Sequence, residues 1–105
     1  MNPTLTLDRC VVRGTHAHKG RTRSLDPTST AAKQLHYGRI VLDKGDAPLN
    51  FPTAGLETGL IALRGRAEVK TGGRSFPMGP YDALYVPRDS EVEVRPGPEG
   101  CDLAE

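Results

Sequence analysis

Strand signals that follow one another closely, separated by glycine and proline turns, constrain the fold of this chain more than any other feature. The 105 residues include 12 glycines and nine prolines. The stretch "EVEVRP" alternates acidic and valine residues, as a strand with one wet face does. We predict an all-β fold, a small antiparallel barrel formed by a single domain, with no long helix. The expected strands span residues 35–42, 58–65, 66–71, 74–79, 82–87, 91–96 and 101–105.

Glycine pairs and prolines predict where these strands end. The pair "GG" at residues 72–73 predicts a hairpin. The stretch "GPEG" at residues 97–100 predicts a turn before the last strand. Asp26 and Pro27 predict a helix of one or two turns that ends near Lys33, with Asp26 as its cap and Pro27 at its first position.

The first 24 residues are expected to form a basic arm, and residues 25–105 are expected to form the barrel. One short strand is expected in the arm, at residues 10–14. A basic arm can contact an anionic ligand or nucleic acid, but charges without interleaved aromatic residues disfavour nucleic acid. The alternative is a solvated arm that packs on the barrel or on a neighbouring subunit. The arm's cations, opposed by Asp8, are Arg9, Arg13, Lys19, Arg21 and Arg23.

The composition, 36% hydrophobic and 26% charged, is typical of a globular domain. No apolar run approaches the roughly 20 residues that span a bilayer, and no secretion signal is visible. We therefore expect a cytoplasmic protein with no membrane partner. In a reducing compartment Cys10 and Cys101 are expected to be free thiols, with a bridge between them as the alternative. The sequence stops at Glu105, inside the last expected strand. We therefore expect either a short member of its protein family or a piece of a longer protein.

Residues 50–69, "NFPTAGLETGLIALRGRAEV", and residues 82–94, "DALYVPRDSEVEV", resemble the two motifs of cupins. Cupins are small antiparallel barrels of the jelly-roll type, and their two motifs supply three histidines and a glutamate to a metal at the mouth. A divalent metal needs several N, O or S donors. The side chains at these positions do not supply them, so we expect no metal and no cofactor. The four positions fall on Phe51, Thr53, Thr58 and Val92.

Strand alternation divides the side chains between two faces, and the resemblance to cupins implies which face lines the barrel. Anchored on the same motif, Thr58, Leu60 and Ala62 face inward, and their neighbours Gly59, Ile61 and Leu63 face outward. Val92 and Val94 are expected inside the barrel, with Glu91 and Glu93 outside. A mostly apolar interior fits either a plain core or a pocket for a small ligand.

Residues 20–46 and 57–69 point to a more specific family within the cupins. Together with "DALYVPRDSEVEV" they resemble the 5-deoxyglucuronate isomerase family and, more distantly, the 4-deoxy-5-hexosulose-uronate ketol-isomerases. Those proteins are two-cupin sugar-acid isomerases of inositol or pectin breakdown. The resemblance is to their N-terminal cupin, which lacks the metal, whereas the C-terminal cupin carries metal and catalysis. It implies a metal-free lobe of an intramolecular oxidoreductase. The alternative is a non-catalytic module for sugar or uronate binding or for dimerisation.

Candidate residues follow from the chemistry of aldose–ketose isomerisation. A base must take a proton next to a carbonyl, and Glu57 is the best-placed carboxylate. Other groups must stabilise the enediolate or bind a sugar hydroxyl, as a tyrosine at the rim does. Two of these residues also have a plain structural interpretation: Glu57 as the cap of a turn, and Tyr85 as a packed ring with its hydroxyl at the rim. The expected ligand-binding residues are Tyr37, Arg39, Thr53, Thr58, Arg64 and Tyr85.

Three histidines form a fallback metal set. His16 and His18 lie two apart and share one face if the arm is extended, and His36 joins them only through folding. A module that senses a sugar or an acid through the arm is a third reading. The partners implied are a small sugar acid and either a second copy of the chain or a second, metal-binding cupin domain, because small barrels often pair.

Overall fold

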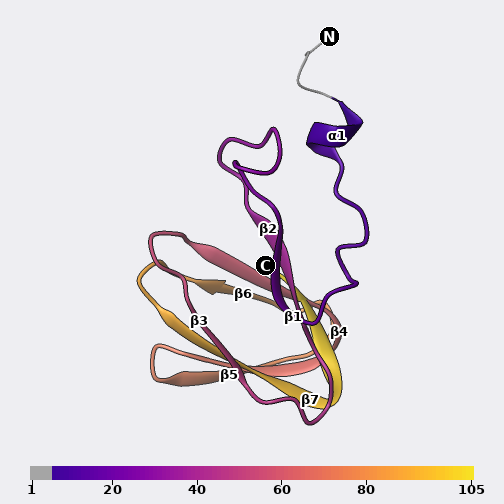
Figure 1. The fold of residues 1–105 in the computed structure, drawn as a ribbon. Coiled ribbons are helices and arrows are strands. Elements are labelled where there is room, and N and C mark those ends of the chain that lie inside the picture. The colour runs from indigo at the N-terminus through magenta and orange to yellow at the C-terminus, as the bar shows by residue number, and fades with distance from the viewer. Residues whose placement is uncertain (1–5) are drawn as a thin grey trace.

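The computed structural model describes residues 6–105 and consists almost entirely of antiparallel strands (Figure 1). The predicted all-β class is confirmed. In the described residues α1 (Leu7–Cys10) is the only helix, and no helix there is long and apolar enough to cross a membrane. The strands are β1 (Gly20–Leu25), β2 (Tyr37–Leu42), β3 (Leu49–Pro52), β4 (Thr58–Thr71), β5 (Arg74–Met78), β6 (Ala83–Val86) and β7 (Glu91–Ala104).

Strands β4 and β7 are long enough to serve in both layers of the fold. The first half of β4 pairs with β6 and with the end of β7, and its second half pairs with β5 and with the start of β7. β2 and β1 extend the first layer from the end of β7, whereas β3 extends the second layer from its start. The result is one antiparallel sheet that folds over on itself into a two-layered barrel (Figure 1).

Three connections meet at one end of this barrel, on the left in Figure 1. They are the β3–β4 connection, the β6–β7 connection and the tip of the β4–β5 hairpin. We call this end, formed by residues 53–57, 72–73 and 87–90, the mouth of the barrel. The opposite end holds the bends of β4 and β7.

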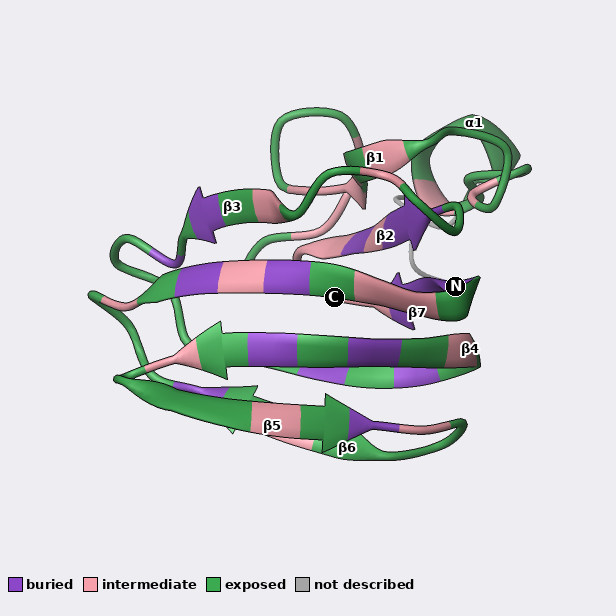
Figure 2. Cartoon of the chain, turned by 90° about the horizontal axis from the view of Figure 1, so that it is seen from below, coloured by how far each residue is buried: buried purple, intermediate pink, exposed green. Residues whose placement is uncertain are grey.

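Apolar side chains from both layers fill the barrel interior. Burial alternates along β4 and along the first half of β7, as the sequence predicts (Figure 2). Glu91 is exposed and Glu93 is partly exposed on the outer side, while Thr58 at the start of β4 is partly buried. The interior is therefore a packed core. Its buried members are Ile40, Leu42, Phe51, Leu60, Ala62, Ala67, Val69, Met78, Val86, Val92, Val94, Cys101 and Leu103.

Gly65 and Gly100 make the bends by which β4 and β7 pass between layers. Their φ angles are +70° and +81°, and the β4–β7 register shifts next to Gly65. A Cβ on Gly65 would lie 2.1 Å from the carbonyl oxygen of Gly100, so no side chain fits. The turn expected at residues 97–100 is therefore wrong. β7 continues through it, and the strands expected at residues 58–65 and 66–71 are one strand, because glycine here bends a strand instead of ending it.

Two expectations near the N-terminus are also wrong. Residues 10–14 form no strand, since α1 occupies the stretch up to Cys10. Residues 27–33 form no helix, because Asp26 caps only a single turn. Its Oδ1 accepts hydrogen bonds from the backbone and side chains of Thr28 and Ser29, which lower the pKa of Asp26 to about 2. The local hydroxyls thus bond within the turn and compete with a continued helix.

The sequence patterns did not predict two of the strands, β1 and β3. β1 is rich in charged and polar residues and is a strand because it pairs with β2. The predicted boundary between arm and barrel, at residues 24 and 25, falls inside it. β3 is short and contains Pro52, and it pairs on one side only, with β7. Proline is compatible with such an edge strand.

The arm leaves the barrel beside β1 and is held at its base (Figure 1). Arg39 forms an ion pair with Asp102 on β7, with Nε 2.7 Å from Oδ1, and also donates to the Thr15 hydroxyl at 3.2 Å. Lys19 Nζ lies 2.9 Å from carboxylate oxygens of both Asp43 and Asp46. The arm's root is thereby tied to β2, β7 and the β2–β3 connection.

Cys101 is a free thiol in the core, with 0% of the residue exposed. Burial raises the pKa of this thiol, which keeps it protonated and unreactive. The alternative of a bridge to Cys10 is not realised.

Replacement of Gly65 by alanine is expected to lower the free energy of unfolding by at least about 2 kcal/mol, because the new Cβ meets the Gly100 carbonyl and the residue keeps a left-handed backbone. Gly59→Ala is the matched control, since Gly59 lies on the same strand with open space at its Cβ position. Its expected change is below about 0.5 kcal/mol. Urea denaturation followed by circular dichroism measures both variants. Equal stability of the two would show that the bend does not need glycine.

Candidate functional site

The four positions at which a cupin would hold its metal do not fit a cation here. Phe51 and Val92 face each other across β3 and β7, and both belong to the apolar core. Within residues 6–105, no three or more histidine, cysteine, aspartate or glutamate side chains gather as a metal site would require. Two apolar side chains and two threonines do not provide the donor set of a divalent cation. The metal that a cupin implies therefore has no fitting ligands at these positions.

Thr53, one of the four, joins two connections of the mouth. Its Oγ1 donates to the Pro87 carbonyl at 2.9 Å and accepts from the Ser90 backbone N–H at 3.0 Å. Its own N–H donates to the Ser90 carbonyl at 2.9 Å. Thr53 is only 4% exposed, so its hydroxyl is engaged by the protein itself. These bonds fix the connection that carries Glu57.

A groove of about 340 Å³ lies at the mouth, between the start of β4 and the segment that precedes β2. Gly38 exchanges two backbone hydrogen bonds of 3.0 Å with Glu105, so the ladder reaches the end of the chain. Glu105 comes two residues after buried Leu103, and residues two apart on a strand face the same side, so Glu105 faces the inner side. The groove brings together three of the predicted residues, Glu57, Thr58 and His36. Its lining includes Arg23, His36, Leu56, Glu57, Thr58 and Glu105.

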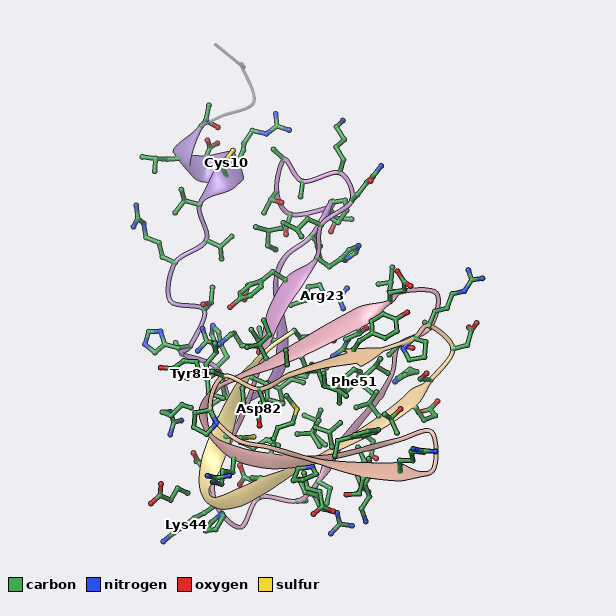
Figure 3. All side chains as sticks on the ribbon, turned by 180° about the vertical axis from the view of Figure 1, so that it is seen from behind. Cys10, Arg23, Lys44, Phe51, Tyr81 and Asp82 are labelled. Carbon is green, nitrogen blue, oxygen red and sulfur yellow. The ribbon has the colours of Figure 1, made fainter. Side chains whose placement is uncertain are left out.

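Arg23 and His36 form one polar wall of this groove. The Arg23 Nη1 lies 2.9 Å from His36 Nδ1. A guanidinium only donates hydrogen bonds, so in this arrangement Nδ1 accepts and Nε2 carries the ring proton. Figure 3 shows Arg23 at β1 and Phe51 between the two layers. The wall thus offers two kinds of N–H donor.

Glu57 and Tyr85 form a second polar pair beside the groove. The Tyr85 hydroxyl donates to Glu57 Oε1 at 2.7 Å. This hydrogen bond is the main cause that raises the pKa of Tyr85 above its usual value of 10.0. Both residues are exposed, and Tyr85 sits on β6, one strand away from Thr58. The pair offers an acceptor and a hydroxyl to a ligand with several hydroxyl groups.

Arg21 and Glu105 form an ion pair on the inner side of the barrel. Arg21 Nε lies 2.9 and 3.1 Å from the two Glu105 carboxylate oxygens, and Nη2 lies 2.7 Å from Oε2. The Glu105 side chain is 7% exposed and that of Arg21 is 30% exposed. The Arg21 guanidinium also lies 4.1 Å from the centre of the Phe51 ring, a cation–π distance. A cation of the protein thus rests on the side chain at a cupin's metal position.

The other predicted residues lie outside the groove. Tyr37 and Arg39 belong to the cluster around Asp102, where Asp102 first and Tyr37 to a smaller extent raise the pKa of Arg39. Arg64 is exposed on β4, opposite Asp102 on β7.

The two arm histidines of the fallback metal set, His16 and His18, are exposed. Neither is among the residues that line the groove with His36.

Sequence reasoning missed Arg23 and Glu105, which line the groove, and Arg21, which holds Glu105. The two arginines were counted as charges of an arm. Their spacing of two residues in "GRTRSL" was the available signal, because alternate positions of a strand share one face. Glu105 gave no signal, since its position depends on the length of β7.

A larger groove of about 500 Å³ lies beside the tip of the β4–β5 hairpin. Two of its lining charges, Lys70 and Glu93, lie opposite each other across β4 and β7, and Glu93 also pairs with Arg95 Nε at 2.9 Å. None of the predicted site residues lines it. We therefore take the groove at Arg23 and Glu57 as the candidate site.

Comparison with known proteins identifies the fold. No family model and no curated protein sequence matches the chain. Among solved structures, a protein of unknown function from Rhizobium leguminosarum is 24% identical, with a TM-score of 0.63 over 81% of this chain and 75% of that one. The Cnp3 cupin domain of Schizosaccharomyces pombe is 17% identical, with a TM-score of 0.64 over 80% of this chain. A predicted oxalate decarboxylase from Thermotoga maritima is 15% identical, with a TM-score of 0.63 over 90% of this chain and 92% of that one.

These likenesses establish a cupin fold and say nothing about activity at such low identity. The chain spans 59% of the length of the Cnp3 chain, so that neighbour contains structure without a counterpart here. The three neighbours have different names, so they indicate no common activity. The groove is the feature from which a function can be inferred.

The substitution Glu57→Gln is expected to lower the pKa of Tyr85 toward 10.0, because a neutral amide holds the phenol proton less strongly than a carboxylate does. Ultraviolet titration of the wild type and the variant measures the change, and Tyr85→Phe identifies the contribution of this phenol. Glu99→Gln, an exposed glutamate at the bend of β7, is the matched control. Identical titration curves for wild type and Glu57→Gln would show that the Tyr85–Glu57 hydrogen bond is absent in solution.

Proposed function

We propose that this chain, whose fold is that of a cupin domain, binds a small sugar acid at its mouth without a metal and without catalysing a reaction alone. In this proposal it corresponds to the metal-free lobe of a sugar-acid isomerase, and a second cupin supplies metal and catalysis. The observation that carries the proposal is a polar groove set above a packed apolar interior. A cavity for a ligand exists at the mouth while the metal positions are filled by Phe51 and Val92.

The groove's side chains match the groups of a sugar acid. Arg23 supplies positive charge and a planar set of donors suited to a carboxylate or to hydroxyl oxygens. His36 and Glu57 provide a donor and an acceptor from separate walls of the groove. Leu35 and Leu56 add apolar contacts for the carbon face of a sugar ring. Few polar groups around an apolar surface are typical of a small-molecule site.

The same geometry favours binding over isomerisation. Isomerisation needs a base together with a group that stabilises the enediolate. Glu57 accepts a hydrogen bond from the Tyr85 hydroxyl at 2.7 Å. Arg39 and Arg64, two of the expected ligand-binding residues, do not line the groove. In our proposal Glu57 therefore receives a hydrogen bond from a sugar hydroxyl and moves no proton. The homodimer, the second cupin domain and the cytoplasmic location stay predictions.

Calorimetric titration of the purified chain with D-glucuronate and D-galacturonate, in excess chelator, tests this function. We expect saturable binding that chelator does not weaken, and no conversion of either sugar acid. Arg23→Ala is expected to weaken binding at least about tenfold, since a charge-assisted hydrogen bond contributes about 1.5–3 kcal/mol. Arg13→Ala is the matched control, because Arg13 is exposed on the arm outside the groove.

Two results would contradict the proposed function. One is binding that appears only after manganese or zinc is added. The other is an Arg23→Ala variant that is folded by circular dichroism and binds as tightly as the Arg13→Ala control.

A further inference from the structure

Glu105 stands between the groove and Arg21. Its side chain lines the groove and at the same time accepts three hydrogen-bond contacts of 2.7 to 3.1 Å from Arg21. Arg21 itself is not among the groove's lining residues. The one carboxylate that Arg21 holds therefore separates it from any ligand in the groove. If Glu105 moves aside, the guanidinium faces the groove directly.

Arg21 is well prepared to hold a carboxylate at this place. Its Nε and Nη2 address two different oxygens, which is the bidentate geometry that favours carboxylates. The Phe51 ring lies under the guanidinium at 4.1 Å and limits its orientations. The plane of donors is thus fixed before a ligand arrives, and preorganisation of this kind favours binding.

A sugar acid carries the same functional group that Glu105 presents. Its carboxylate offers two oxygens to Arg21, and its ring and hydroxyls extend along the groove toward His36 and Glu57. Arg23 lies two residues from Arg21 on the same face of β1 and adds a second positive charge. The carboxylates of Glu57 and Glu105 balance these two cations, so a ligand's carboxylate meets an unpaired guanidinium only where it takes the place of Glu105.

We propose that Arg21 is the anchor for the ligand's carboxylate and that Glu105 occupies this anchor as an internal substitute. A sugar acid then binds by displacing the Glu105 side chain, and Glu105 sets the affinity of the site. This inference rests on the proposed function and specifies the chemical group that it recognises. It also gives a role to the Glu105–Arg21 ion pair, which lies beside the groove.

The test compares D-glucuronate with D-glucuronamide, its neutral amide, by calorimetry in chelator on the wild type and three variants of the chain. Glu105→Gln keeps the size of the side chain and removes the competing charge. We expect it to bind glucuronate at least about tenfold more tightly than the wild type does, with little change for glucuronamide. Glu99→Gln, outside the groove, is the matched control and is expected to bind like the wild type.

The double variant Arg21→Gln with Glu105→Gln removes the anchor without leaving a buried charge unpaired, so folding is protected. Its glucuronate affinity is expected to fall at least about tenfold below that of Glu105→Gln and to approach that for glucuronamide. Thermal unfolding by circular dichroism confirms that each variant is folded.

The outcomes separate the inference from the proposed function. Binding of glucuronate by the wild type that changes in neither Glu105→Gln nor the double variant would overturn the inference and leave the proposed function intact. Binding of neither ligand by any of the four forms would overturn the proposed function, and the inference with it. If Glu105→Gln binds glucuronate more tightly than the wild type, and neither Glu99→Gln nor the double variant does, the result supports both the inference and the proposed function.

Discussion

The contact between Gly65 and Gly100 is the constraint on which the rest of this structure depends. Two strands of 14 residues can serve both layers only if each bends where they touch. The backbones approach so closely at this point that a Cβ on Gly65 would meet the Gly100 carbonyl. The bend turns both ends of β4 toward the mouth, so Thr58 and Thr71 lie at the same end of the barrel. The groove, its charged walls and the filled interior all follow from that arrangement.

The mouth illustrates how a metal site can be replaced by side chains of the protein. A cupin's metal is a cation held by imidazole and carboxylate groups. Here Phe51 and Val92 extend the apolar core to the mouth, and the Arg21 guanidinium lies over the Phe51 ring. A guanidinium keeps its charge at any physiological pH, and its hydrogen bonds have a fixed direction. In the proposed function this guanidinium, now paired with Glu105, is the group that recognises an anion.

Much of the fold was predictable because burial imposes a clear period on the strands. The alternation through Leu60 and Ala62 and through Val92 and Val94 placed the inward set correctly. The bends were not predictable, since "GPEG" and the glycine at residue 65 read as strand ends when only local patterns are considered. β1 was missed because its arginines resemble an arm, and only the pairing with β2 makes it a strand.

The candidate site was predictable in part for the same reason. Glu57 and Thr58 were found because they precede an apolar strand at a motif position, and His36 was named for its chemistry. Arg39 and Tyr37 were selected for the same chemistry, yet they point to the other side of β2, toward Asp102. Residue type alone does not reveal which face of a strand is the inner one. The Arg21–Glu105 pair joins residues 84 positions apart, and no local pattern can place them together.

Backbone amide chemical shifts of the chain, recorded as D-glucuronate is added in excess chelator, test the central claim most directly. Metal-free binding at the groove predicts saturable shifts at residues 21–23, 36–38, 57–59 and 105, with smaller changes elsewhere. Shifts that appear only when a divalent metal is present would contradict a metal-free site. Shifts concentrated at residues 70–75 and 91–93 would contradict the assignment of the groove, because they would place the ligand beside the β4–β5 hairpin.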